Sequence, residues 1–492
     1  NWYSIADDLD NYPLWAVAPN TLPKWRRGQA INEWREILNT ASADTPATNT
    51  AYQRRYLGTV STGATTTVIP MQAGGFDEYG TPADGQFSGL NVPLTIGGES
   101  RAITGYVAST NTFTVGIAFS SAPTNGTAAV VNGQASAGPA RLDPYCGMTV
   151  DTRRSEIWQL GNGGHGDYYG NEVMKIDLMA DEPEWREWMV GSTGYVINDN
   201  QFTAQYVAGN AWYDDDGVSG ALPCSQHTYY CQQFIERHGR AVRFGGGSIS
   251  SSGTAFVDVE SFDADVAEGV NGWDAQYTYK AAILSGYTAT YAGGSTVIRP
   301  PVCRDPRTDH VYTMSAAGFR EFTPSVGGPS GADTGGTWAG MVGGVANGAG
   351  TGDATAVDTT RGRMLMAGGT TLTYWVYDID GGTGWTSGTF TGAAASAISG
   401  GVVYEGWGLV FVPEIDAYLM RDGAAGGTVL KIDAATFEVT DLGATDGGSI
   451  PATAARSGAT EQVYNKFQYV PKLRGVVYAP ANGENLWFLR TH

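Results

Sequence analysis

The chain has 492 residues, and 49 aspartates and glutamates outnumber 29 lysines and arginines, giving a formal net charge of −20. A nucleic-acid backbone binder needs a basic stripe, and none is present, so this composition argues against nucleic acid as a partner. No apolar run reaches the roughly 18 residues of a membrane-spanning helix, so no membrane span is predicted. The length suits one large repeat domain with a second domain inserted.

The first 52 residues divide into two parts. Residues 1–29 are rich in Asn, Pro and Trp and are predicted to form an ordered arm. Residues 30–52 begin with a tryptophan-bearing segment, 30–38, that reads as a strand without a partner nearby in the sequence. The chain starts at Asn1 instead of methionine, which leaves open a removed signal segment.

Residues 53–138 have a different pattern, rich in Thr, Gly and Val, with short alternating strands. The stretch 99–126 resembles a small β-domain of tailed-phage structural proteins. Because this region lacks the pattern of the later repeats, we predict an inserted β-domain that folds as a separate unit. Any small β-sandwich would fit the same pattern.

Residues 139–492 contain a repeat. In the first copy, an apolar run before Asp151, a polar turn and a second run ending in glycines form a hairpin, and two further strands follow, the last carrying Trp185 and Trp188. Six such units are predicted, with hairpin turns near Thr152, Arg237, Arg307, Thr360, Ile415 and Leu473. A four-stranded sheet of this kind has two apolar faces and must stack on its neighbours. The last unit stops after three strands, so residues 30–38 are predicted to supply its fourth.

The double glycines and the fourth-strand tryptophans resemble those of kelch and galactose-oxidase-like β-propellers. The resemblance covers nearly everything except residues 53–138. It implies an all-β, six-bladed β-propeller in residues 139–492, closed by the N-terminal strand.

Two loops contain candidate binding residues. A glycine-bent loop carries an imidazole, a carboxylate and an amide, and a long loop at 191–223 carries aromatic and acidic residues, in the kind of segment where binding usually resides. The candidates are His165, Asp167, Asn171, Trp212, Tyr213, Asp214 and Asp216. The alternative interpretation is architectural, with turn-forming hydrogen bonds in the first loop and a solvated acidic turn or a packed tryptophan in the second.

No catalytic residue, metal site or cofactor is predicted. Galactose oxidases hold copper with two tyrosines and two histidines, whereas no two of the five histidines here have a short ligand spacing. Four cysteines, Cys146, Cys224, Cys231 and Cys303, allow three disulfide pairings, and all remain open.

The leading hypothesis is a non-enzymatic virion-surface or tail-fibre structural protein of a phage-like particle, which decorates the particle or binds a host glycan or receptor. Its expected partners are other particle proteins or copies of itself, and surface glycans, and its expected location is the virion surface or the extracellular space. The alternative is a secreted carbohydrate-active or galactose-oxidase-like propeller enzyme.

Overall fold

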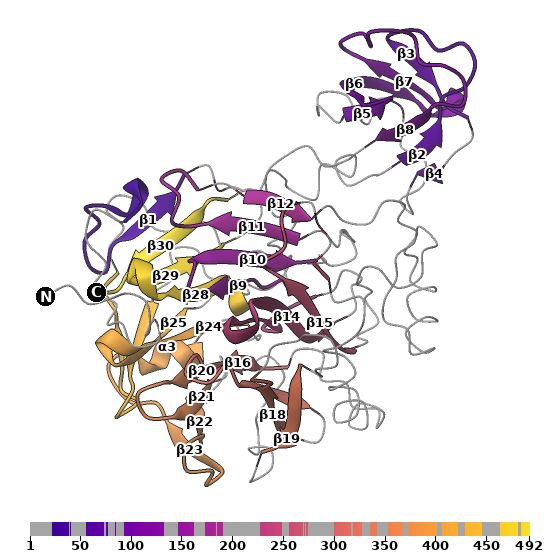
Figure 1. Cartoon of the computed structure of the whole chain (residues 1–492). Helices are drawn as coiled ribbons and strands as arrows, with labels where there is room; N and C mark the ends of the chain where they lie inside the picture. Colours follow the sequence, from indigo (N-terminus) through magenta and orange to yellow (C-terminus); the bar gives the residue numbers. More distant parts are fainter. Residues whose placement is uncertain are drawn as a thin grey trace, which may run out of the picture.

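The computed structural model is all-β (Figure 1). It describes residues 22–38, 40, 56–72, 75–76, 84, 93–131, 146–161, 173–183, 185–189, 227–247, 255–268, 270, 272–273, 300–315, 318–326, 335–341, 353–367, 372–400, 406–421, 429–444, 463–480 and 484–492. Within these ranges the strands form seven antiparallel sheets. None of the helices in the same ranges has the length and apolar character required to cross a bilayer.

The repeat region forms six of these sheets, each built from consecutive strands. The first three are β9 (Thr149–Asp151), β10 (Glu156–Leu160), β11 (Val173–Asp177) and β12 (Trp185–Met189); β13 (Gln232–Ile235), β14 (Arg240–Gly247) and β15 (Ala255–Asp263); and β16 (Val302–Arg304), β17 (Val311–Ser315), β18 (Gly318–Pro324) and β19 (Gly336–Gly340). The second of these has three strands, and an isolated bridge joins Phe262 on β15 to Trp273, where a fourth strand would lie.

The remaining three sheets follow the same plan. They are β20 (Ala354–Asp358), β21 (Arg363–Ala367), β22 (Thr373–Asp378) and β23 (Trp385–Thr389); β24 (Gly408–Val412), β25 (Ala417–Arg421), β26 (Val429–Asp433) and β27 (Val439–Asp441); and β28 (Phe467–Val470), β29 (Gly475–Tyr478), β30 (Leu486–Arg490) and β1 (Trp34–Ile37). A short helix, α3 (Ala395–Gly400), follows β23, and short 3-10 turns lie at Lys24–Arg26, Ala108–Thr110, Glu236–His238, Pro413–Ile415, Tyr464–Lys466 and Pro471–Leu473.

The first strands of these sheets contact one another in succession. β9 contacts β13, then β13 contacts β16, and the series continues through β20, β24 and β28, which contacts β9 again. These strands are almost wholly buried, as in β24, where every residue is buried. Buried apolar side chains from neighbouring sheets form common clusters, which is how sheets with two apolar faces are covered. The arrangement is therefore propeller-like.

The strand expected in residues 30–38 is β1, and it pairs with the last strand of the chain. Trp34 lies opposite Leu489, and Ile37 lies opposite Leu486. Trp34 and Ile37 are 2% and 0% exposed, because both side chains point between sheets.

Hydrogen bonds and ion pairs at the hairpin turns link neighbouring sheets. The carboxylate of Asp358, at the end of β20, is fully buried and accepts the backbone N–H groups of Thr360 and Arg361, both at 3.0 Å. The guanidinium of Arg361 then reaches Asp416, in the turn of the next sheet, with two bonds of 2.6 Å. This bond lowers the pKa of Asp416, against a small opposing effect of burial.

The same Asp–Arg–Asp arrangement recurs at two other turns, in Asp151–Arg154–Asp265 and Asp305–Arg307–Asp380. Other polar contacts join the remaining neighbours: Arg304 with Glu236, Tyr469 with Glu414, and Lys472 with the carbonyl of Arg153. We call this set of contacts the turn belt.

A seventh sheet lies in the inserted region, in the order β3-β7-β6-β5-β8-β2-β4. Its strands are β2 (Tyr56–Thr59), β3 (Val68–Pro70), β4 (Gly75–Phe76), β5 (Pro93–Ile96), β6 (Glu99–Val107), β7 (Thr112–Val115) and β8 (Ala128–Val131). It has its own hydrophobic cluster, which includes Ile69, Leu94, Ile103 and Phe113. In Figure 1 these strands stand apart from the other six sheets.

Five uncharged side chains lie on one face of the inserted sheet, over β3, β7 and β6. The register places Val68 opposite Thr114, and both Pro70 and Val107 opposite Thr112, so these five side chains share a face. Val68 and Val107 are 40% and 43% exposed. We call these five residues the outer face of the insert.

Candidate functional site

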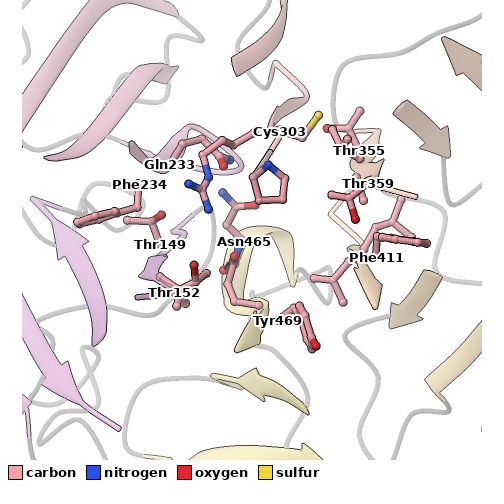
Figure 2. A pocket seen from close by; sticks show the side chains of 18 of the residues that line it. Thr149, Thr152, Gln233, Phe234, Cys303, Thr355, Thr359, Phe411, Asn465 and Tyr469 are labelled. Carbon is pink, nitrogen blue, oxygen red and sulfur yellow. Dashed lines mark hydrogen bonds between the residues drawn. The ribbon is translucent and has the colours of Figure 1, made fainter. Parts of the chain in front are cut away.

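The first strands of the six sheets surround a pocket of about 230 Å³ (Figure 2). Each of the six sheets contributes at least one residue to the wall, for example Thr149, Gln233, Cys303, Thr355, Phe411 and Gln468, and Asn465, just before β28, lines it too. Because the lining comes from all six first strands, the pocket lies on the common axis of the sheets. We call it the axial pocket.

One end of the axial pocket is formed by hairpin turns. The lining residues that follow the first strands are Thr152, Pro306, Thr359, Pro413 and Pro471. These turns also carry the turn belt, so ion pairs and hydrogen bonds fix the wall positions around the pocket mouth.

The segment 227–232 leads into β13 and lies at the opposite ends of the first strands; we call it the closing segment. Its backbone and side chains bond to residues that precede other first strands: Thr228 accepts the N–H of Gly147 at 2.8 Å, and the hydroxyl of Tyr230 donates to the carbonyl of Trp407 at 2.8 Å. Gly147 is required there, because a Cβ atom at this position would lie 2.2 Å from the carbonyl oxygen of Tyr229. The closing segment is therefore tied to the residues that precede β9 and β24.

Two amides hold the closing segment against the pocket. The side-chain nitrogen of Asn465 donates to the carbonyls of Tyr230 and Gln232, at 2.7 and 2.8 Å. The side-chain nitrogen of Gln233 donates to the carbonyls of Tyr230 and Val302, at 3.1 and 3.2 Å. Both residues line the pocket.

The charged groups beside the pocket are paired with one another. The guanidinium of Arg304, only 8% exposed, lies 2.6 Å from Asp309 and 3.1 Å from Glu236. Burial opposes its charge, but Glu236 and Asp309 outweigh burial and raise the pKa of Arg304. Within the described ranges there is no cluster of His, Cys, Asp and Glu that could hold a metal ion.

The thiol in the pocket wall, that of Cys303, is buried. Burial raises the pKa of Cys303 to about 12, and it raises the pKa of Cys231 as well. Cys231 and Cys303 are free thiols, and Cys224 lies outside the described residues.

The axial pocket is not the site expected from the sequence. His165, Asp167, Asn171, Trp212, Tyr213, Asp214 and Asp216 all lie outside the described residues, as does the loop 191–223. A signal for the pocket was nevertheless present in the sequence: amide and hydroxyl side chains such as Gln233, Asn465 and Thr355 stand in or next to otherwise apolar first strands.

Fold and site together define an all-β protein with propeller-like sheets around a mainly uncharged axial pocket. No family model matches the chain, and no curated protein sequence matches it. Among solved structures, it is similar to a protein of unknown function from Bacteroides thetaiotaomicron, with 14% identity, a TM-score of 0.34, and coverage of 86% of this chain and 93% of that one.

Two further solved structures are similar over most of their length. An auxiliary nutrient binding protein from Bacteroides ovatus has 10% identity and a TM-score of 0.36, over 90% of this chain and 98% of that one. A chain of a nidogen/laminin complex has 8% identity and a TM-score of 0.32, over 80% of this chain and 93% of that one. At these TM-scores the likeness carries no argument about function.

Proposed function

We propose that this chain is a non-enzymatic structural protein on the surface or in a tail fibre of a phage-like particle, where it decorates the particle or binds a host glycan or receptor. Its fold in this proposal is a kelch-like, six-bladed β-propeller in which each sheet of the repeat region is one blade. The succession of contacts from β9 through β28 and back to β9 supports six blades, and the pairing of β1 with β30 supports closure by the N-terminal strand.

The observation that carries a binding role is the axial pocket. Its walls present hydroxyl, amide and apolar side chains and the guanidinium of Arg304, which is paired with Glu236 and Asp309. A general acid or base must be able to exchange a proton with a substrate. Glu236 and Asp309 are instead bound to Arg304, and Asp309 also accepts the backbone N–H of Arg237 at 2.7 Å. This arrangement favours binding over acid–base chemistry.

The inserted sheet supports an assembled state on the virion surface or outside the cell. Each copy carries a formal charge of −20, so two copies repel each other at most approaches. The five residues of the outer face of the insert are uncharged, and Val68 and Val107 are exposed there, so a further copy can pack on them with little repulsion. The proposed partners are therefore copies of the chain, together with other particle proteins and surface glycans.

The test is a paired measurement of binding and turnover on one glycan panel. The purified chain is applied to immobilised glycans, and the same glycans are incubated with it in solution, with and without added copper, and analysed by mass spectrometry. Retention without any change of mass supports the proposal. Cleaved or oxidised glycans contradict it and favour the secreted propeller enzyme. The urea-unfolded chain is the control for nonspecific retention.

Antibodies against residues 53–138 test the location. Labelling of intact particles from the source of the chain, seen by electron microscopy, supports the particle assignment. Labelling of the culture supernatant alone contradicts it.

A further inference from the structure

The inner end of the axial pocket has a fixed hydrogen-bonding polarity. The side-chain nitrogens of Asn465 and Gln233 each donate to two backbone carbonyls of the closing segment or of β16. An amide nitrogen has two hydrogens, so both are used in each residue. Rotating either amide by half a turn would set its oxygen against two carbonyl oxygens, which excludes the flipped orientation.

Of these two amides, only the oxygens of Asn465 and Gln233 remain for a ligand, and amide oxygens only accept hydrogen bonds. A ligand beside these amides must bring donors. A carboxylate has acceptor oxygens alone at neutral pH, so it would place oxygen against oxygen and would lose its hydration without forming new hydrogen bonds. Among the described residues that line the wall, the one cation is the guanidinium of Arg304, and it is already paired with Glu236 and Asp309.

The rest of the wall selects against a full positive charge. Val150, Phe411 and other apolar side chains line the pocket beside the hydroxyls of Thr149 and Thr359. A cation in such a wall needs a carboxylate partner, and the neighbouring carboxylates are already bound to Arg304. Hydroxyl groups satisfy both requirements, because each can donate to an amide oxygen and exchange hydrogen bonds with a threonine.

The volume limits the size of the ligand. The pocket's 230 Å³ lies below the roughly 300 to 1,000 Å³ of sites for drug-sized ligands. We infer that the axial pocket binds one uncharged, hydroxyl-rich unit, the terminal ring of a neutral sugar, through the amide oxygens of Asn465 and Gln233. This inference deepens the proposed glycan-binding role and rests on it.

The experiment is titration calorimetry of the full chain with three matched probes: methyl glucoside, glucuronic acid and glucosamine. The neutral probe should bind at least about tenfold more tightly than either charged one. Two neighbouring threonines in the turn after β20 are replaced by tryptophan, one as the test and one as its control. Thr359 lines the pocket and Thr360, beside it, is exposed and does not. Thr359→Trp should fill the mouth and abolish binding, whereas Thr360→Trp should bind like the parent chain.

Thr149→Val is a second variant, which keeps the shape of the side chain and removes one hydroxyl. It should weaken binding of the neutral probe several-fold. This variant keeps the inference testable if Thr359→Trp does not fold. Tighter binding of the charged probes, unchanged binding in both Thr359→Trp and Thr149→Val, or no binding of any probe overturns the inference. None of these outcomes touches the proposed particle role, which the antibody labelling and the turnover assay test separately.

Discussion

Replacing Trp34 by alanine tests whether the N-terminal strand holds the repeat region together. Trp34 is on β1, is 2% exposed, and packs in a cluster with Tyr478 and Trp487. The guanidinium of the buried Arg421 lies 5.4 Å from its ring centroid. The substitution therefore removes a large buried ring and one face of a cation–π contact.

The expected loss follows from these contacts. Replacing a buried tryptophan or phenylalanine by alanine costs about 3 to 5 kcal/mol, including the cavity that remains. Loss of a buried cation–π contact costs about 2 kcal/mol, and part of this is already counted in the first figure. We expect the free energy of unfolding of the repeat region to fall by about 4 kcal/mol.

Urea unfolding followed by far-ultraviolet circular dichroism measures this loss. Leu38→Ala is the matched control, since Leu38 lies just after β1 and is 64% exposed; it should change the free energy of unfolding by less than about 0.5 kcal/mol. A loss below about 1 kcal/mol for Trp34→Ala would refute the reasoning, because the strand would then be a dispensable attachment.

Three further predictions follow from other parts of the molecule. Excision of residues 53–138 with a short Gly/Ser linker should leave the thermal unfolding of the repeat region unchanged, because the inserted sheet has its own core; collapse of the remaining chain would show a shared core. Gly147→Ala should lower the free energy of unfolding by about 1 to 3 kcal/mol, since the new Cβ would displace the carbonyl of Tyr229, and an unaltered denaturation midpoint would contradict the close approach. The hydrogen bond from Arg307 lowers the pKa of Asp380, and the one from Arg361 lowers the pKa of Asp416, both from the usual 3.8. As the pH falls below that value, the unfolded chain binds more protons than the folded chain, so the free energy of unfolding should fall. A melting temperature that stays constant from pH 5 to about pH 2 would exclude a stabilising turn belt.

The hairpins and sheets were the part of the structure that the sequence could predict. A polar turn between two apolar runs is local information, and it is found where expected around Asp151 and around Asp358. The strand in residues 30–38 could also be inferred, since the last sheet ended one strand short and a tryptophan-bearing strand lacked a partner. Its pairing with β30 is observed.

The axial pocket could not be predicted in the same way. Thr149 and Thr355 meet in one wall although 206 positions separate them in the chain, because the first strands of distant repeats converge. The closing segment was equally hidden. Its path depends on Tyr229 adopting a positive φ of 43° and on a close approach to Gly147, and neither has a distinctive pattern of residues.

The pairing of β1 with β30 has a consequence for the order of folding. During synthesis β1 is made more than 440 residues before its partner β30. The inserted sheet needs only its own strands and can form early, whereas β1 must wait, with Trp34 uncovered, until β30 has left the ribosome. Such a distant pairing forms slowly, and it leaves an unpaired strand edge open to other chains until β30 is made.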